Sequence, residues 1–144
     1  MLYIGEKKEN ITYQERKCAY AILQGKEDKV GLIEVRDEYF LIGGGIENNE
    51  DEIEALKRET IEEAGYSIKE IKKFEEVEAY YLDKERGYLK VVATIYIAEL
   101  DEYIKNPIEL GHKLIWISLK ERKKEMFRKY QEAVVQEYQR TLTK

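Results

Sequence analysis

The stretch that decides the fold runs from residue 43 to residue 66 and reads GGGIENNEDEIEALKRETIEEAGY. Three glycines precede a segment with the spacing of an amphipathic helix, which we expect over residues 50–64. Asn49 is the expected N-cap, the acidic residues that follow suit the positive end of the helix dipole, and Gly65 is the expected C-terminal stop. The apolar stripe that this helix would turn towards a sheet consists of Ile53, Leu56, Thr60 and Ala64.

Three carboxylates share one face of the expected helix. Glu59, Glu62 and Glu63 stand at positions i, i+3 and i+4, which brings their side chains close together. Like charges at this spacing repel one another unless a positive partner offsets them. Mg²⁺ suits this role, because it takes oxygen ligands and is usually held by a few carboxylates together with substrate phosphates. The glycines permit close approach of a ligand and offer carbonyl oxygens, and Arg58 can hold Glu59 or contact a phosphate.

A charged, solvated helix face is the plain alternative for any single pair of glutamates in this acidic chain. The full spacing argues against that alternative, because seven fixed positions occur together. They are Gly44, Glu50, Arg58, Glu59, Glu62, Glu63 and Gly65. The segment from Gly44 to Tyr66 resembles the signature of the Nudix hydrolases, G-x5-E-x7-R-E-U-x-E-E-x-G-U, where U is aliphatic. It departs from this box at the two U positions, which hold Thr60 and Tyr66.

The resemblance implies an α/β (α+β) fold: an α/β/α sandwich with a mixed central sheet, the box helix and C-terminal helices. It also implies hydrolysis of a nucleoside diphosphate derivative, with Mg²⁺ or Mn²⁺ assisting the attack of water on a phosphorus atom. By similarity, the metal ligands would be Glu59, Glu62, Glu63 and the carbonyl of Gly43 or Gly44. Arg58 would orient the catalytic Glu59, and Glu50 would support the loop or bind an outer metal.

The resemblance leaves the general base open between a glutamate of the box helix and one in a later loop. Glu109 is the loop candidate, because it lies just before the strand that bears Trp116. His112, the only histidine, is interpreted as a surface or substrate contact rather than as the base. Glu59 and Glu63 are both expected on an exposed helix face, so replacing either by Gln should leave the fold intact.

Other residues are candidates for holding the substrate. Arg16 and Arg36 flank strands that lead towards the glycine run, which makes them preferred over Arg86 as phosphate contacts. Tyr80 and Tyr81 stand near the distance past the box at which the diadenosine-polyphosphate subgroup has a tyrosine. A chain with 12 tyrosines also offers such matches by coincidence.

Two classes of function are compatible with these residues. The first is a metal-dependent diphosphohydrolase, with an ordinary or oxidised nucleoside triphosphate as the leading substrate and a dinucleoside polyphosphate as the alternative. The second is a non-catalytic module that binds a nucleotide or a protein partner. The complete set of box carboxylates favours the enzyme.

The rest of the sequence supplies strands on both sides of the box helix. The predicted strands cover residues 16–23, 29–35, 39–42, 68–81, 88–100 and 114–117. The glycine run is expected to form a loop. Ser118 is interpreted as the cap of a helix that reaches Phe127, and a final amphipathic helix follows. Its apolar face contains Tyr130, Ala133, Val134, Tyr138 and Leu142.

Composition excludes several classes of protein. The chain has 144 residues, of which 43% are hydrophobic and 38% charged, so one domain over residues 1–144 is expected. Its aromatic content argues against disorder, and its net charge of −5 disfavours a long nucleic-acid partner. The chain shows no signal peptide or membrane segment. Cys18 has no partner and is expected to be a buried, inert thiol, which fits a reducing cytoplasm; a homodimer is left open.

Overall fold

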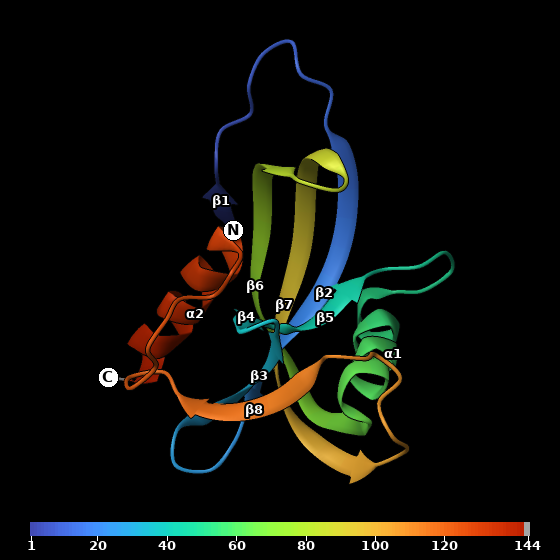
Figure 1. Ribbon diagram of the computed structural model, residues 1–144, viewed down its shortest axis with the longest axis vertical. Coiled ribbons are helices and arrows are strands. Elements are labelled where there is room, and N and C mark those ends of the chain that lie inside the picture. The colour runs from blue at the N-terminus through green and yellow to red at the C-terminus, as the bar shows by residue number, and fades with distance from the viewer. Residues whose placement is uncertain (143–144) are drawn as a thin grey trace.

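A mixed β-sheet with one helix on each side forms the fold in the computed structural model, which describes residues 1–142 (Figure 1). The strands are β1 (Leu2–Ile4), β2 (Gln14–Gln24), β3 (Lys29–Val35), β4 (Glu38–Phe40), β5 (Ile42–Gly45), β6 (Tyr66–Asp83), β7 (Gly87–Tyr103) and β8 (Lys113–Ser118). The helices are α1 (Glu52–Ala64) and α2 (Lys129–Leu142). The predicted α+β sandwich with a mixed sheet is confirmed.

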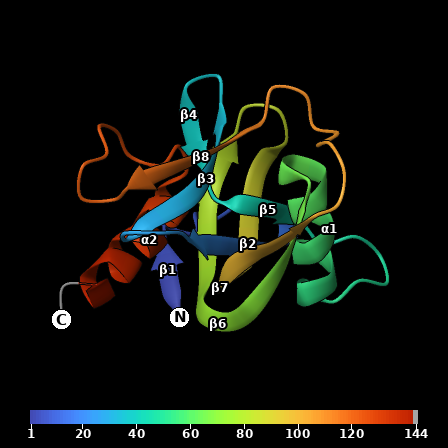
Figure 2. The same ribbon diagram turned by 90° about the horizontal axis from the view of Figure 1, so that it is seen from below.

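The central strand β2 is buried on both faces. The strands lie in the order β1-β6-β7-β2-β3-β4, with β5 paired to β2 and β8 paired to β3 (Figure 2). Even-numbered residues 18–22 pack on the α2 side of the sheet, and odd-numbered residues 19–23 pack on the α1 side. Cys18 is 1% exposed, as predicted, and burial raises the pKa of its thiol. A thiol that stays protonated is a poor nucleophile.

Helix α1 begins later than the sequence predicts, because its N-cap is Asp51 and not Asn49. The Asp51 side chain accepts a hydrogen bond from the Glu54 N–H at 2.8 Å, and the Glu54 carboxylate accepts one from the Asp51 N–H at 3.1 Å. This reciprocal pair is a capping box. Asn49 has a φ of 69°, a left-handed conformation that asparagine tolerates, so it turns the chain before the helix. Gly65 ends α1 as predicted, with a φ of 81°.

The glycine run forms strand β5 rather than the predicted loop, and it pairs with β2. Glycine is required here because of close approach: a Cβ at Gly43 would collide with the carbonyl of Ala19. A Cβ at Gly44 would lie 2.8 Å from the carboxyl carbon of Glu59. The residues of the predicted strand over 39–42 are shared between two short strands, β4 and β5, and β5 continues into the glycines.

The helix predicted over 118–127 is wrong, because within the described residues this segment forms turns and one β-bridge. Four cations lie near its start, where they would oppose a helix dipole. Its backbone finds partners elsewhere: the Met126 N–H donates to Glu132 at 2.9 Å, and the Phe127 N–H donates to the Tyr39 carbonyl at 2.9 Å. Tertiary contacts therefore replace the helix.

Strands β6 and β7 are longer than predicted, and β1 was not expected. The β6–β7 hairpin keeps its pairing up to Asp83 and Gly87, so both strands extend beyond 68–81 and 88–100. β1 adds a parallel strand to the outer edge of β6. Residues of the hairpin turn and of the segment that leads into α2 line a common cavity.

Candidate active site

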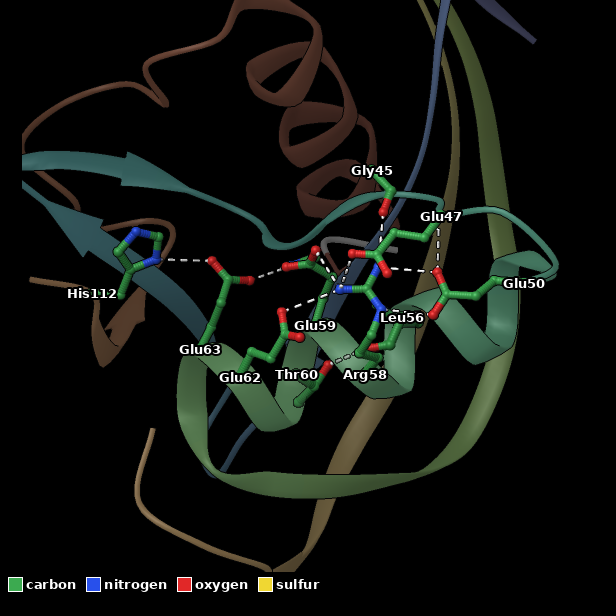
Figure 3. Close-up of polar contacts among 11 residues, drawn as sticks. Gly45, Glu47, Glu50, Leu56, Arg58, Glu59, Thr60, Glu62, Glu63 and His112 are labelled. Atoms are coloured by element: carbon green, nitrogen blue, oxygen red, sulfur yellow. Dashed lines mark hydrogen bonds and ion pairs between the residues drawn. The ribbon is translucent and has the colours of Figure 1, made fainter. Parts of the chain in front are cut away.

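The box residues meet between α1 and β5 (Figure 3). Leu56 and Thr60 fix the helix in place, because both side chains are fully buried. The Thr60 hydroxyl donates to the Leu56 carbonyl at 2.7 Å, which satisfies the hydroxyl inside the core. This bond explains how Thr60 occupies an aliphatic position of the signature.

Arg58 lies at the centre of the site and joins the box glutamates to β5 (Figure 3). Its guanidinium donates to both carboxylate oxygens of Glu50, at 2.6 and 3.0 Å, and to the Gly45 carbonyl at 3.0 Å. Its Nη1 lies 3.1 Å from a carboxylate oxygen of Glu59 and 3.1 Å from one of Glu62. The pKa of Arg58 is raised, chiefly by the bond to Glu50. A weaker ion pair of 3.5 Å joins Arg58 to a fourth carboxylate, that of Glu47. The arginine is therefore permanently charged and fixes the orientation of the three carboxylates to which it donates hydrogen bonds.

Glu63 is buried, which corrects the expectation that it lies on an exposed helix face. Its side chain accepts the Gly43 N–H at 2.8 Å and lies 3.0 Å from Nδ1 of His112. The whole residue is only 6% exposed. Burial, reinforced by the charges of Glu59 and Glu109, raises the pKa of Glu63 to about 8, although the Gly43 hydrogen bond opposes the change. Negative charge is thus crowded and poorly solvated here.

Glu59 is half-buried, and its surroundings shift its pKa in opposite directions. Burial raises its pKa, the charge of Glu62 adds to that effect, and the bonds from Arg58 oppose it. The side chain lies against Gly44, where any larger residue would displace it. Its carboxylate is thereby held at the edge of β5.

The donor set fits a hard divalent cation in its chemistry. Three carboxylates and the glycine carbonyls are the oxygen ligands that Mg²⁺ and Mn²⁺ prefer. The pKa values of Glu59 and Glu63 are raised chiefly by burial, and neighbouring carboxylates add to this effect. Within residues 1–142, however, no three His, Cys, Asp or Glu side chains converge on one point suited to a metal. Their oxygens instead contact Arg58, Gly43 and His112, so a cation would compete with these partners.

A cavity of about 510 Å³ opens beside the carboxylates. The predicted residues that line it are Glu59, Glu63, Gly43, Gly44, Glu109, His112, Arg16 and Tyr81. Glu109 is exposed, whereas His112 is half-buried against Glu63. Arg36 lies outside this cavity and lines a neighbouring one. A larger cavity of about 720 Å³ lies beside Trp116, and no box residue lines it.

Four residues that were not preferred from the sequence also line the cavity at the carboxylates. They are Arg86, Arg128, Tyr130 and Gln131. Arg86 lies in the β6–β7 turn, and Arg128 directly precedes α2. Gln131 also fixes the neighbouring chain, because its side-chain oxygen accepts the Leu41 N–H at 2.8 Å. Only the three-dimensional fold brings these segments together, so no local sequence signal pointed to Arg128.

The NUDIX domain family model matches residues 14–138. The chain belongs to the NUDIX family. NUDIX hydrolases cleave small nucleotides in which a nucleoside diphosphate is linked to another group. They generally use divalent metal ions. No curated protein matches this chain in sequence. None of the helices among residues 1–142 is long and apolar enough to cross a membrane.

Solved NUDIX structures share the fold of this chain. A NUDIX hydrolase from Nitrosomonas europaea has a TM-score of 0.72 at 16% identity, covering 89% of this chain and 90% of that one. The MutT NUDIX hydrolase from Burkholderia pseudomallei has a TM-score of 0.69 at 21% identity, with coverages of 85% and 98%. The MutT protein from Methanosarcina mazei has a TM-score of 0.69 at 17% identity, with coverages of 94% and 100%. At these identities the likeness concerns the fold alone.

Proposed function

We propose that this NUDIX chain is a divalent-metal-dependent hydrolase that cleaves the diphosphate linkage of a nucleoside diphosphate derivative. The observation that carries the proposal is the complete set of box carboxylates: Glu59 and Glu62 contact Arg58, and Glu59 and Glu63 line a cavity of about 510 Å³. An ordinary or oxidised nucleoside triphosphate is the leading substrate class. A dinucleoside polyphosphate is the alternative.

The residues that would hold Mg²⁺ or Mn²⁺ are Glu59, Glu62, Glu63 and the carbonyl of Gly43 or Gly44. When bound, the ion would neutralise charge on the phosphoryl oxygens and lower the pKa of a bound water. Arg58 would hold Glu59 and Glu62 in a fixed orientation, since its fork already contacts both, and Glu59 lines the cavity. Positioned charges of this kind are usually the largest single contribution to catalysis of such reactions.

Glu109 is our candidate for the general base. It is exposed, lines the cavity with Glu59 and Glu63, and is free of the hydrogen bonds that fix those two carboxylates within the described chain. A carboxylate that reaches both solvent and cavity can accept a proton from an attacking water. A glutamate of the box is the alternative base. We assign His112 to the site as a contact of Glu63 and of the substrate.

The test is turnover of a panel of nucleoside triphosphates, dinucleoside polyphosphates and nucleotide sugars, with Mg²⁺ or Mn²⁺ and with a chelator. We expect metal-dependent release of phosphate or pyrophosphate, and we expect Glu63→Gln to reduce it about a thousandfold. Gln keeps the shape of the side chain and can still accept the Gly43 N–H. Glu52→Gln, an exposed change at the start of the same helix, is the matched control.

Equal turnover in Glu63→Gln and Glu52→Gln would refute the metal-site assignment. No turnover of the whole panel would favour a non-catalytic module that only binds nucleotides. The same assay on Glu109→Gln identifies the base: a sharp loss of turnover assigns it to Glu109, whereas a mild loss moves it to the box.

A further inference from the structure

The cavity at the carboxylates continues past β5 to the other face of the sheet. A Cβ at Gly44 would contact Glu59, whereas a Cβ at Gly45 would lie 3.2 Å from Nη2 of Arg16. Successive residues of a strand face opposite sides of a sheet. Glu59 and Arg16 therefore lie on opposite sides of β5, yet both line the same cavity. Figure 2 shows β5 between the two helices, and the glycines of β5 pair with β2.

The half on the α2 side is built from arginines and tyrosines. The Arg128 guanidinium lies 4.8 Å from the centre of the Tyr81 ring, and Tyr81 stacks on Tyr130 at 6.1 Å and 26°. An ion pair of 2.7 Å to Asp83 holds Arg128 in this position. The stacked rings keep the guanidinium in a fixed orientation at the cavity wall.

Two further arginines of this half lack any partner of their own. Among residues 1–142, the guanidinium groups of Arg16 and Arg86 make no hydrogen bond and no ion pair, although the chain carries 30 acidic side chains. Arg16 is half-buried, so its charge is only partly solvated. Glu85 is the one carboxylate of the β6–β7 turn that lines the same cavity, and it is exposed. The α2 half is therefore positive, in contrast to the carboxylate half.

We propose that Arg16, Arg86 and Arg128 form a phosphate-binding subsite that takes a phosphate group of the substrate beyond the diphosphate held at the carboxylates. Guanidinium forks bind phosphate oxygens with two hydrogen bonds at once, which makes arginine the fitting residue for this task. This inference rests on the proposed hydrolase function and specifies its substrate class. The substrate carries three or more phosphates, as a nucleoside triphosphate or a dinucleoside polyphosphate does.

The division of charge along the cavity supports this substrate class. The diphosphate is the charged group of a nucleotide sugar. Its sugar hydroxyls accept weaker hydrogen bonds from guanidinium groups than phosphate oxygens do. A longer phosphate chain can contact a metal on the carboxylate side and still reach the arginines on the α2 side. The carboxylates and the arginines line one cavity, so a single chain of phosphates can contact both.

The first experiment measures binding of inorganic tripolyphosphate by calorimetry, with a chelator present so that no divalent ion contributes. We expect Arg16→Gln and Arg86→Gln each to weaken binding about tenfold, as for loss of a hydrogen bond between charged groups. Lys72→Gln is the charge-matched control, because Lys72 is exposed on β6 and lines none of the described cavities. The folds should be unaffected, since neither arginine has a partner to lose.

The second experiment uses turnover with Mg²⁺. Arg86→Gln should raise the KM for a nucleoside triphosphate about tenfold and leave the KM for a nucleotide sugar unchanged. Failure of wild type to bind tripolyphosphate, or equal affinity of Arg16→Gln, Arg86→Gln and Lys72→Gln, would overturn the subsite. Absence of any turnover would refute the hydrolase but leave the binding experiment to decide the subsite.

Discussion

Arginine and glutamate form two clusters on opposite sides of the sheet. The clusters differ in the number of carboxylates that share one arginine. On the α1 side, the single Arg58 guanidinium is shared among four carboxylates, those of Glu47, Glu50, Glu59 and Glu62. On the α2 side, Arg122 donates two hydrogen bonds of 2.6 Å to Glu132 alone. Glu132 also accepts the Met126 N–H at 2.9 Å and the Gln136 side chain at 2.8 Å. One cluster has an excess of negative charge, and the other is balanced.

The pKa values follow this difference. Burial alone would raise the pKa of Glu132, but the bonds from Arg122, Met126 and Gln136 hold it below its usual value. Glu63 is equally buried, yet it has no arginine of its own, and its pKa is raised to about 8. A balanced cluster stabilises the fold. An unbalanced cluster costs stability until a cation binds, which is typical of a functional site.

The same Glu-to-Gln change should therefore have opposite effects in the two clusters. Glu132→Gln leaves Arg122 without its counter-charge, and we expect the free energy of unfolding to fall by about 3 kcal/mol. Glu63→Gln fixes the neutral form that the raised pKa of Glu63 already favours, so metal-free protein should be as stable as wild type or more stable. Urea unfolding in the presence of a chelator measures both changes, with the exposed Glu125→Gln as control.

A similar loss of stability in Glu132→Gln and Glu63→Gln would contradict the contrast between the clusters. Loss in Glu63→Gln alone would show that the carboxylate at α1 is a structural group. In that case the Gly43 and His112 contacts would matter more for folding than for a metal site.

The balanced cluster also predicts an acid-sensitive stability. Because the pKa of Glu132 is lower in the folded protein than its usual value of 4.5, the folded state binds fewer protons at acidic pH than the unfolded state does. This contribution is complete above pH 4.5 and is lost as the pH falls through the folded pKa. Unfolding measured between neutral and acidic pH should show a smaller decline in Glu132→Gln than in wild type. Parallel declines in the two proteins would exclude Glu132 as the responsible group.

The sequence was a good guide to the α1 cluster and a poor guide to its α2 counterpart. The box residues are local: Arg58, Glu59, Glu62 and Glu63 lie within two turns of one helix, so helical periodicity alone brings them together. The Arg122–Glu132 pair joins an irregular segment to α2, and the basic run that contains Arg122 was interpreted as a helix. The hydrogen bonds that the Glu132 carboxylate accepts from Arg122 and from the Met126 N–H explain why that segment stays irregular.

Similar reasons explain which parts of the cavity were predicted. Gly44 was expected beside the carboxylates because it precedes their helix. Arg36 was preferred over Arg86 because it follows a strand towards the glycines, yet the β6–β7 turn brings Arg86 to the cavity and leaves Arg36 outside it. Which strand ends and turns meet at one cavity depends on the order of the strands in the sheet, and no local sequence pattern gives that order.

The smallest expected effect comes from replacing each arginine by lysine, which keeps the charge but removes the planar fork. Arg122→Lys can keep the ion pair with Glu132 but loses one of two hydrogen bonds. It should therefore lower the free energy of unfolding by about 1 kcal/mol and leave turnover unchanged. Arg58→Lys cannot reach its four partners at once. Since those contacts orient candidate metal ligands, turnover should fall about tenfold, with a loss of stability below about 1 kcal/mol.

Turnover and urea unfolding, measured on the same samples of both lysine variants, decide this last comparison. The structural interpretation of Arg122 requires that stability falls while the rate per folded molecule stays constant. The positioning role of Arg58 requires that the rate per folded molecule falls while stability changes little. More metal should then be needed for half-maximal turnover, because the ligands would be less well oriented. If Arg58→Lys lost stability in proportion to rate, the α1 cluster would be a second structural ion-pair network, and the catalytic role of its carboxylates would have to be reassigned.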